Sequence, residues 1–306
     1  MKVLFVCSGN SKFGISPIVK NQGESLKNNG VNIAYFTIKG KGFKGYLKNI
    51  PRLKKFLKSN KYDLIHAHYS LSAIAASLAG AKPIITSLMG SDIQAKTFWK
   101  LMIKFFNRIS WKTTIVKSLR MREQIGISDA LVIPNGVDFD KFKLIDKNIA
   151  KRKVRFNDKK HIIFVSNPER YEKNYQLAKS AYDLLNVDNV ELNTIHNVNH
   201  DLMPYYYYAA DVLVLTSLWE GSPNVIKEAM ACNLPIVSTD VGDVKDIIAD
   251  TEGCYITSYD PKDVAEKIEM ALDFGKRTNG RENIKHLEIN AIAKKIIDIY
   301  EQSINR

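Results

Sequence analysis

The chain has 306 residues, 45% of them hydrophobic and 25% charged, a composition typical of a globular protein. This length predicts two domains, and its three cysteines lack metal-ligand spacing, which argues against a disulfide framework or a zinc site. The net charge of +13 is uneven, because residues 1–150 carry +17 and residues 151–306 carry −4. No secretory signal and no apolar run of about 18 residues is visible, so we expect a cytoplasmic protein.

The first half alternates short apolar runs with amphipathic stretches, the pattern of a parallel α/β sheet. The expected strands are Val3–Cys7, Val31–Thr37, Leu64–Ile65, Pro83–Thr86, Thr113–Val116 and Leu131–Ile133. The expected helices are Ile18–Asn29, Phe43–Ser59, Leu71–Leu78 and Thr97–Ser110. We expect Pro51 to break or kink the second of these helices.

The second half repeats the alternation after an Asn-Gly turn in Pro134–Asp138, where we place the domain boundary. The expected strands are Ile162–Val165, Val190–Thr194, Val212–Leu215 and Ile236–Val237. The expected helices are Tyr175–Leu185, Met203–Ala209, Val225–Ala231, Asp243–Ile248, Pro261–Phe274 and Ile284–Ser303. We therefore predict two doubly wound α/β domains, residues 1–140 and 150–285, followed by a C-terminal helix over residues 286–306.

The most informative segment follows the apolar run Val212–Leu215. A loop with Gly221, Ser222 and Pro223 leads into a helix that is expected to begin near Asn224. Ligands of open α/β sheets bind beyond the carboxyl ends of the strands, and a helix N-terminus suits a phosphate. A glycine lets a ligand approach the backbone closely. The segment therefore predicts a site for an anionic ligand.

Two carboxylates, Glu220 and Glu228, flank the start of this helix. If the two carboxylates were the catalytic pair of a retaining glycosidase, their carboxyl groups would lie about 5–5.5 Å apart. Eight helical residues instead rise about 12 Å. We therefore expect the two side chains to contact different parts of one extended ligand. The alternative is a loop carboxylate and a solvated helix residue with no shared role.

The run Ser217-x2-Glu220-Gly-x-Pro-Asn-x3-Glu228-Ala-Met resembles the nucleotide-sugar motif of glycosyltransferase family 4. Four further segments resemble the same family: Asp63–His68, Thr86–Asp92, Ile133–Asp138 and Tyr206–Leu215. The resemblance implies a GT-B fold, in which two Rossmann-like domains face each other across a cleft. It also implies that the N-terminal domain binds the acceptor, that the C-terminal domain binds the nucleotide sugar, and that the last helix crosses back to the N-terminal domain.

The resemblance implies roles for individual residues. Glu228 would hold the ribose hydroxyls, and His68 would lie near the transferred sugar. Lys173 and Arg170 would neutralise the leaving diphosphate. Contacts to the donor sugar and phosphates would come from Glu220, Gly221, Ser222, Pro223, Asn224 and Val225. Contacts to the acceptor would come from Gly9, Gly14, Ser91 and Asp92.

The sequence departs from the family pattern at several of these places. Pro168 holds the position of the usual arginine, so Arg170 is displaced toward Lys173. Met89 stands where a histidine is common, and Asp243 replaces the second glycine of a frequent Gly-Gly pair.

The resemblance implies a retaining, metal-independent glycosyltransferase. It would move a sugar from a nucleoside-diphosphate sugar, such as a UDP-sugar, to a glycan or lipid-linked acceptor in cell-surface polysaccharide synthesis. Two alternatives stay open: a sugar-nucleotide epimerase of similar fold, and an inert membrane-associated binding protein of a polysaccharide assembly complex.

Two patterns could be mistaken for metal sites. Asp138-Phe-Asp140 matches the Asp-x-Asp of metal-dependent glycosyltransferases but follows the interdomain turn, so we predict no metal there. We also expect His66 and His68 to face opposite sides of their strand, which would prevent a shared metal ion.

Two stretches account for most of the basic charge. Lys39–Lys61 holds nine basic residues and Ile93–Arg122 holds eight, with no acidic residue in either. A solvated basic face and nucleic-acid binding are two interpretations, although no nucleic-acid motif is present. Aromatic and aliphatic residues interleave with the basic ones, which favours a third interpretation, peripheral attachment to an anionic membrane at its inner face.

Overall fold

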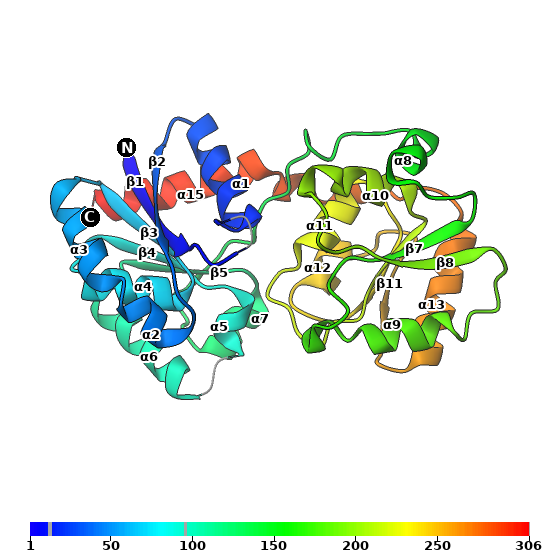
Figure 1. Cartoon of the computed structure of the whole chain (residues 1–306), viewed down its shortest axis with the longest axis horizontal. Coiled ribbons are helices and arrows are strands. Elements are labelled where there is room, and N and C mark those ends of the chain that lie inside the picture. Colours follow the sequence, from blue (N-terminus) through cyan, green and yellow to red (C-terminus); the bar gives the residue numbers. More distant parts are fainter. Residues whose placement is uncertain (12–13, 95–96, 306) are drawn as a thin grey trace. The chain divides into compact units, whose positions relative to one another are not determined.

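The computed structural model describes residues 1–11, 14–94 and 97–305. The chain divides into two compact units (Figure 1). The N-terminal unit comprises Met1–Gly136 together with Ile289–Arg306, and the C-terminal unit comprises Val137–Glu288.

The N-terminal unit is built on a six-stranded parallel sheet with the strand order β2-β1-β3-β4-β5-β6. Its strands are β1 (Lys2–Ser8), β2 (Asn32–Ile38), β3 (Leu64–His68), β4 (Ile84–Ser87), β5 (Thr113–Val116) and β6 (Leu131–Val132). Its helices are α1 (Pro17–Asn28), α2 (Gly42–Leu47), α3 (Ile50–Ser59), α4 (Ser70–Leu78), α5 (Gly90–Ile93), α6 (Thr97–Ile109), α7 (Leu119–Ile125) and α15 (Ile289–Ile304).

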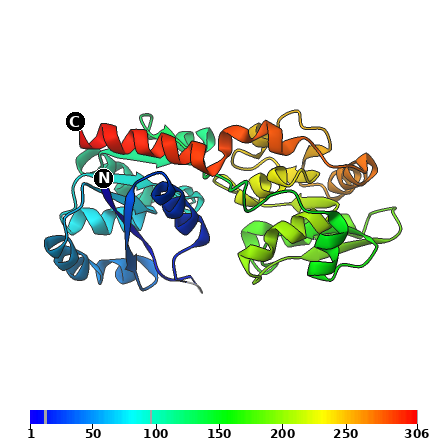
Figure 2. The ribbon, with the colours of Figure 1, turned by 90° about the horizontal axis from the view of Figure 1, so that it is seen from above.

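Alternating side chains distribute the core of this unit over the two faces of the sheet. Leu4 and Val6 of β1 pack in one cluster with buried residues of α4, α6 and α7. On the opposite face, α15 (red in Figures 1 and 2) lies beside α1. The Tyr300 hydroxyl of α15 reaches His66 of β3, so the last helix belongs to this unit's core.

The helical stretch around Pro51 is divided, but not at the proline. Helix α2 ends at Leu47 and α3 begins at Ile50, so Pro51 lies in the first turn of α3. A proline is favourable there, because the amide that it lacks would have no partner within the helix. The expected kink is therefore a helix start.

The C-terminal unit is built on a five-stranded parallel sheet with the order β11-β10-β9-β7-β8. Its strands are β7 (Lys160–Phe164), β8 (Val190–Thr194), β9 (Val212–Leu215), β10 (Ile236–Thr239) and β11 (Cys254–Thr257). Its helices are α8 (Lys147–Val154), α9 (Tyr175–Tyr182), α10 (Met203–Ala209), α11 (Asn224–Ala231), α12 (Val244–Ile248), α13 (Pro261–Phe274) and α14 (Gly280–Asn283). Short 3-10 turns cover Tyr171–Lys173, His200–Leu202 and Lys285–Leu287.

The prediction of two parallel α/β domains is confirmed. The expected single helix Ile284–Ser303 is wrong in its first turns, since a 3-10 turn precedes α15 and Glu288 between them has extended backbone angles. Within the described ranges, no helix combines the length and the apolar character needed to span a bilayer.

Candidate functional site

The strand order marks one place in the C-terminal sheet where a ligand is expected. Strand β7 lies between β8 and β9, so the chain moves to one side of β7 and then crosses to the other. Open α/β sheets bind ligands beyond the carboxyl ends of the strands at such a switch point. The loops after β7 and β9 carry Lys173 and Ser217–Glu220. Topology and motif therefore indicate the same site.

The structure brings Lys173, Ser217 and Glu220 together from these two loops. The Lys173 ammonium forms an ion pair with Oε1 of Glu220, and the Ser217 hydroxyl donates a hydrogen bond of 2.9 Å to the same oxygen. Both ionic side chains are more than four-fifths buried. In the free protein the predicted phosphate-binding ammonium is thus held by the predicted sugar-binding carboxylate.

Backbone contacts clamp the two loops against each other. The Thr216 hydroxyl donates to the carbonyl oxygens of Lys173 at 3.2 Å and of Asn174 at 2.9 Å. The Leu218 amide donates to the carbonyl oxygen of Glu172 at 2.9 Å. The Lys173–Glu220 pair therefore lies on a braced backbone.

Glu228, one turn into α11, accepts hydrogen bonds from two side chains distant in sequence. The Tyr207 hydroxyl of α10 donates to Oε2 at 2.8 Å, and Nε2 of His200 lies 3.1 Å from Oε1. Because a carboxylate only accepts, His200 must carry its proton on Nε2. An ionised carboxylate has about four acceptor positions, so these two bonds leave room for donors such as vicinal hydroxyls.

Tyr207 and His200 were missed by the sequence analysis. They precede Glu228 by 21 and 28 residues, and no spacing rule links them to α11. Burial, followed by the neighbouring Glu228 carboxylate, raises the pKa of Tyr207 well above its usual value. The tyrosine is therefore a permanent donor to Glu228.

The loop before α11 approaches a second loop closely. A Cβ atom added to Gly242, whose φ is +60°, would lie 2.8 Å from the carbonyl oxygen of Gly221. The Ser222 hydroxyl donates to Oδ2 of Asp243 at 2.6 Å. Asp243, a departure from the family pattern, thus anchors the glycine-containing loop.

Helix α11 begins directly after this loop, with Pro223 at its N-cap position. Proline has no side chain that could cap the helix amides, and Asn224 and Val225 form the first turn. The positive end of the helix dipole therefore faces the loop. Lys227 is buried in the same helix; burial lowers its pKa to about 8, although the Asp243 and Glu228 carboxylates oppose this shift. The sequence analysis missed this buried charge.

Arg170 pairs with a different carboxylate from Lys173. Its guanidinium forms an ion pair with Glu172, two residues away, and its side chain is half exposed. The two cations that the resemblance assigns to the diphosphate therefore pair with different carboxylates in the free protein, although, against the effect of burial, the charge of each lowers the pKa of Glu172.

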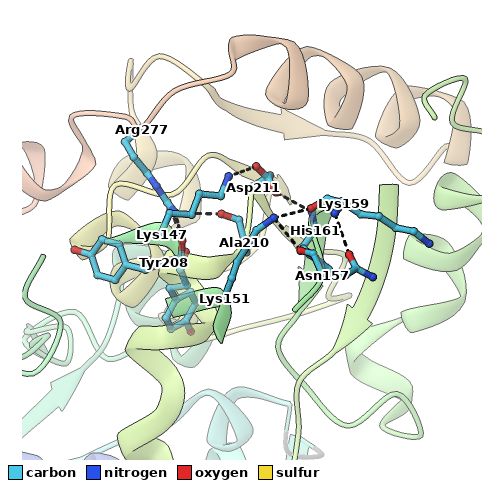
Figure 3. Close-up of polar contacts among 10 residues, drawn as sticks. Lys147, Lys151, Asn157, Lys159, His161, Tyr208, Ala210, Asp211 and Arg277 are labelled. Atoms are coloured by element: carbon cyan, nitrogen blue, oxygen red, sulfur yellow. Dashed lines mark hydrogen bonds and ion pairs between the residues drawn. The ribbon is translucent and has the colours of Figure 1, made fainter. Parts of the chain in front are cut away.

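A polar cluster at the amino ends of the strands is structural (Figure 3). Asp211 accepts from the His161 amide at 2.7 Å and from the Lys147 ammonium at 2.5 Å, which ties β7, β9 and α8 together. Arg277 donates to the carbonyl oxygens of Tyr207 at 3.1 Å and of Ala210 at 3.2 Å. Since these carbonyls belong to the end of α10, Arg277 holds the helix that presents Tyr207 to Glu228.

In the N-terminal unit, His66 and His68 do not face opposite sides of β3. Their rings stack with centroids 4.3 Å apart, because residues two apart in a strand point to the same face. His66 uses both ring nitrogens, with the Tyr300 hydroxyl 2.5 Å from Nδ1 and the Ser87 hydroxyl 2.8 Å from Nε2. Our expectation was therefore wrong, and His66 is a core residue.

His68 differs from His66 in having both ring nitrogens buried without a hydrogen-bond partner. Its side chain lines a cavity of about 290 Å³, together with Ser8, Ser11, Ser16, Tyr69, Met89 and Ser91. Burial, and then the positive charge of Lys117, lowers the pKa of His68 to about 3. Tyr69, the next residue, has a φ of 84°, an uncommon conformation for a non-glycine residue. His68 therefore borders this cavity as a buried, neutral imidazole, beside a strained backbone.

Of the other predicted acceptor residues, Ser91 is at the cavity, whereas Asp92, Gly9 and Gly14 are not among its lining residues. Ser91 lines the cavity, whereas both oxygens of Asp92 accept backbone bonds, from Ser70 at 3.1 Å and from Met89 at 2.5 Å. Gly9 permits close packing on β2, since an added Cβ would lie 2.9 Å from Cβ of Thr37. Gly14 has a φ of +80° and no atom within 4 Å of an added Cβ.

Within residues 1–11, 14–94 and 97–305, no group of three histidine, cysteine or acidic residues could hold a metal ion. Oδ1 of Asp138 accepts from the amides of Asp140 at 3.0 Å and Lys141 at 2.9 Å. This carboxylate therefore stabilises a turn.

Two protein families match separate parts of the chain. "Glycosyl transferases group 1" matches residues 142–273, and "Glycosyl transferase 4-like" matches residues 13–118. The matches cover the switch-point loops of the C-terminal unit and most of the sheet of the N-terminal unit.

Individual proteins support the same assignment. The UDP-Gal:alpha-D-GlcNAc-diphosphoundecaprenol alpha-1,3-galactosyltransferase of Escherichia coli is 27% identical over 240 residues, which are 64% of this chain and 62% of that protein. A teichuronic acid biosynthesis glycosyltransferase of Bacillus subtilis is matched over 60% of its length. This chain therefore spans about three fifths of the length of each of these two relatives.

Solved structures show the same fold. A sucrose-phosphate synthase from Thermosynechococcus elongatus has a TM-score of 0.82 at 18% identity, with 99% of each chain covered. Anabaena Alr3699/HepE, solved with UDP and glucose, has a TM-score of 0.79 at 15% identity, with 99% of this chain and 100% of that chain covered. The chain therefore belongs to the group 1 glycosyl transferases and has their GT-B fold of two Rossmann-like domains.

Proposed function

We propose that this protein is a retaining glycosyltransferase whose C-terminal unit binds a nucleoside-diphosphate sugar. The observation that carries the proposal is the arrangement at the β7–β9 switch point. The Lys173–Glu220 pair, the loop before α11 and the Glu228 carboxylate all lie on elements that end or begin there.

Each part of the donor has a chemical counterpart in this set. Glu228 would accept hydrogen bonds from the ribose hydroxyls while Tyr207 and His200 hold its carboxylate in place. When the diphosphate binds, the Lys173 ammonium would leave Glu220 and form an ion pair with the diphosphate. Glu220, still bound by Ser217, would then accept from the sugar hydroxyls. Donor binding would thus exchange one ion pair for another.

We further propose that the reaction needs no metal ion. A departing diphosphate needs fixed positive charge, which Lys173 and the dipole of α11 would supply. Retention would follow if the acceptor attacks the face from which the diphosphate leaves, as the family resemblance implies.

The acceptor would be a glycan or a lipid-linked glycan bound by the N-terminal unit, in the synthesis of a cell-surface polysaccharide. His68 supports this assignment, because a buried imidazole without a partner is suited to a ligand hydroxyl. The Escherichia coli relative is named for an acceptor linked to diphosphoundecaprenol.

The test is to measure UDP, GDP and ADP binding by thermal shift and calorimetry, with and without EDTA. A nucleotide at 100 times its Kd should add about 2.7 kcal/mol to the free energy of unfolding. We expect one nucleotide to bind equally in EDTA, and Glu228→Ala to abolish its effect.

Glu266→Ala is the matched control, because that carboxylate is exposed on α13, away from the switch point. Release of nucleoside diphosphate from the matching sugar nucleotide, dependent on added acceptor, would establish transfer. Binding without release in the presence of lipid-linked acceptors would instead indicate an inert binding protein, and no nucleotide binding would overturn the donor site.

A further inference from the structure

Helix α6 of the N-terminal unit has apolar side chains on two sides. Ile103 and Phe106 are buried in the cluster that α6 shares with α4. The side turned away from that cluster carries four large apolar residues that are 54% to 63% exposed: Phe98, Leu101, Phe105 and Ile109. Their spacing of three, four and four residues places them in one stripe along the helix. The burial of the first face therefore leaves a second apolar face uncovered.

A row of basic side chains borders this stripe. Lys100, Lys104 and Arg108 each precede a residue of the stripe and repeat every four residues. In the part of the chain that the structure describes, none of the three pairs with a carboxylate. The surrounding segment Ile93–Arg122 has no acidic residue at all. The exposed face of α6 thus combines apolar area with uncompensated positive charge.

The charge identifies the partner that fits this face. A second copy of the chain would bring the same net charge of +13. A nucleic acid would match the charge but would leave the apolar stripe in water. An anionic bilayer satisfies both features, because an amphipathic helix lying in the interface buries its apolar face among acyl chains and its basic residues meet lipid phosphates.

We propose that the exposed face of α6 docks this protein on an anionic lipid surface. Phe98, Leu101, Phe105 and Ile109 enter the boundary between headgroups and acyl chains. Lys100, Lys104 and Arg108 contact lipid phosphates. The helix lies parallel to the surface, since its 13 residues are too few to cross a bilayer. This inference does not depend on the transfer reaction.

The experiment is co-sedimentation of the full chain with vesicles of phosphatidylcholine alone or mixed equally with phosphatidylglycerol. We expect binding to the anionic vesicles only, weakening as salt rises. Lys100→Gln combined with Lys104→Gln should weaken binding about 25-fold, since each basic residue near an anionic surface contributes about fivefold. Leu101→Glu combined with Phe105→Glu should weaken it more than tenfold, because carboxylates cannot enter the interface.

Leu144→Glu is the matched control, since this leucine is 72% exposed in the other unit, and it should bind as the wild type does. Nucleotide binding without vesicles shows that each variant is folded and tests the donor site separately. Failure of the wild type to bind anionic vesicles, or binding by the Leu101/Phe105 variant at wild-type strength, would overturn the proposal. So would a wild-type dimer that this variant dissociates, because the stripe would then be a contact between copies.

Discussion

The Tyr207 hydroxyl donates a hydrogen bond of 2.8 Å to Oε2 of Glu228, deep in the C-terminal unit. Tyr207 is completely buried, and Arg277 donates to its backbone carbonyl. The carboxylate proposed to hold the ribose is therefore oriented by a helix that is itself anchored at the other edge of the sheet.

Tyr207→Phe should lower both the free energy of unfolding and the affinity for the nucleotide. A hydrogen bond to a charged group contributes about 1.5–3 kcal/mol, and Glu228 would lose the donor that orients it. Urea unfolding and nucleotide titration measure the two effects. Tyr208→Phe is the control, because within the described part of the chain the buried Tyr208 hydroxyl meets only the weakly polar Cys232 thiol and no carboxylate, so its removal should cost less. Equal losses in both variants would contradict the assigned role.

His200→Ala should weaken donor binding and leave turnover at saturating donor almost unchanged. Nε2 of His200 contacts the carboxylate of Glu228, which is proposed to bind the ribose, and not the proposed reacting atoms. Steady-state kinetics should show a raised KM for the donor with kcat nearly constant. His200→Gln can still donate to Glu228 and should recover part of the affinity. His196→Ala, in the same loop but exposed, should behave as the wild type. A fall in kcat alone would be inconsistent with a positioning role.

Lys173→Ala should slow transfer about 10²- to 10³-fold, the usual effect of removing one preorganised group that stabilises transition-state charge. Glu220 keeps its Ser217 hydrogen bond in the variant, so the loop should remain folded. Single-turnover kinetics with saturating donor isolate the step. Lys179→Ala is the control, because this lysine pairs with Asp183 on the surface of α9. An unchanged rate for Lys173→Ala would remove the lysine from the mechanism.

The buried His68 should lower the free energy of unfolding in mild acid. Its pKa is about 3 in the folded chain and near 6.5 when exposed, so between these values only the unfolded chain binds the proton. The free energy of unfolding therefore falls as pH drops below 6.5, by about 2 kcal/mol for this residue at pH 5. Urea unfolding at pH 7 and pH 5 should show a smaller loss for His68→Gln than for the wild type.

Asp92 acts in the opposite direction. Burial raises its pKa to about 6, so below that pH its folded form binds a proton that the unfolded form does not, which favours folding. Asp92 is present in both the wild type and His68→Gln, so the difference between their pH dependences isolates the contribution of His68. Identical pH dependence in the wild type and His68→Gln would mean that His68 is not buried as a neutral ring.

Local sequence signals predicted most of the elements but not all. Helices α5 (Gly90–Ile93), α7 (Leu119–Ile125), α8 (Lys147–Val154) and α14 (Gly280–Asn283) and strand β11 (Cys254–Thr257) were missed. Helix α8 is short and polar, with basic residues in its last turn, and β11 has four residues that are mostly only partly buried, so neither contains a long apolar run. These elements depend on their neighbours in the fold more than on their own pattern.

The sequence by itself determined the two parallel sheets, the family and the proposed donor loop from Ser217 to Glu228, because each depends on residues close together in the chain. Hydrophobic periods and the strand–loop–helix motif act over a few residues, so they can be recognised without the fold. Only the tertiary structure decided that Lys173 pairs with Glu220 and that Tyr207 and His200 contact Glu228. The same holds for the hydrogen bond between the Tyr300 hydroxyl and His66. These contacts join positions from 21 to 234 residues apart, and strand order and helix packing bring them together.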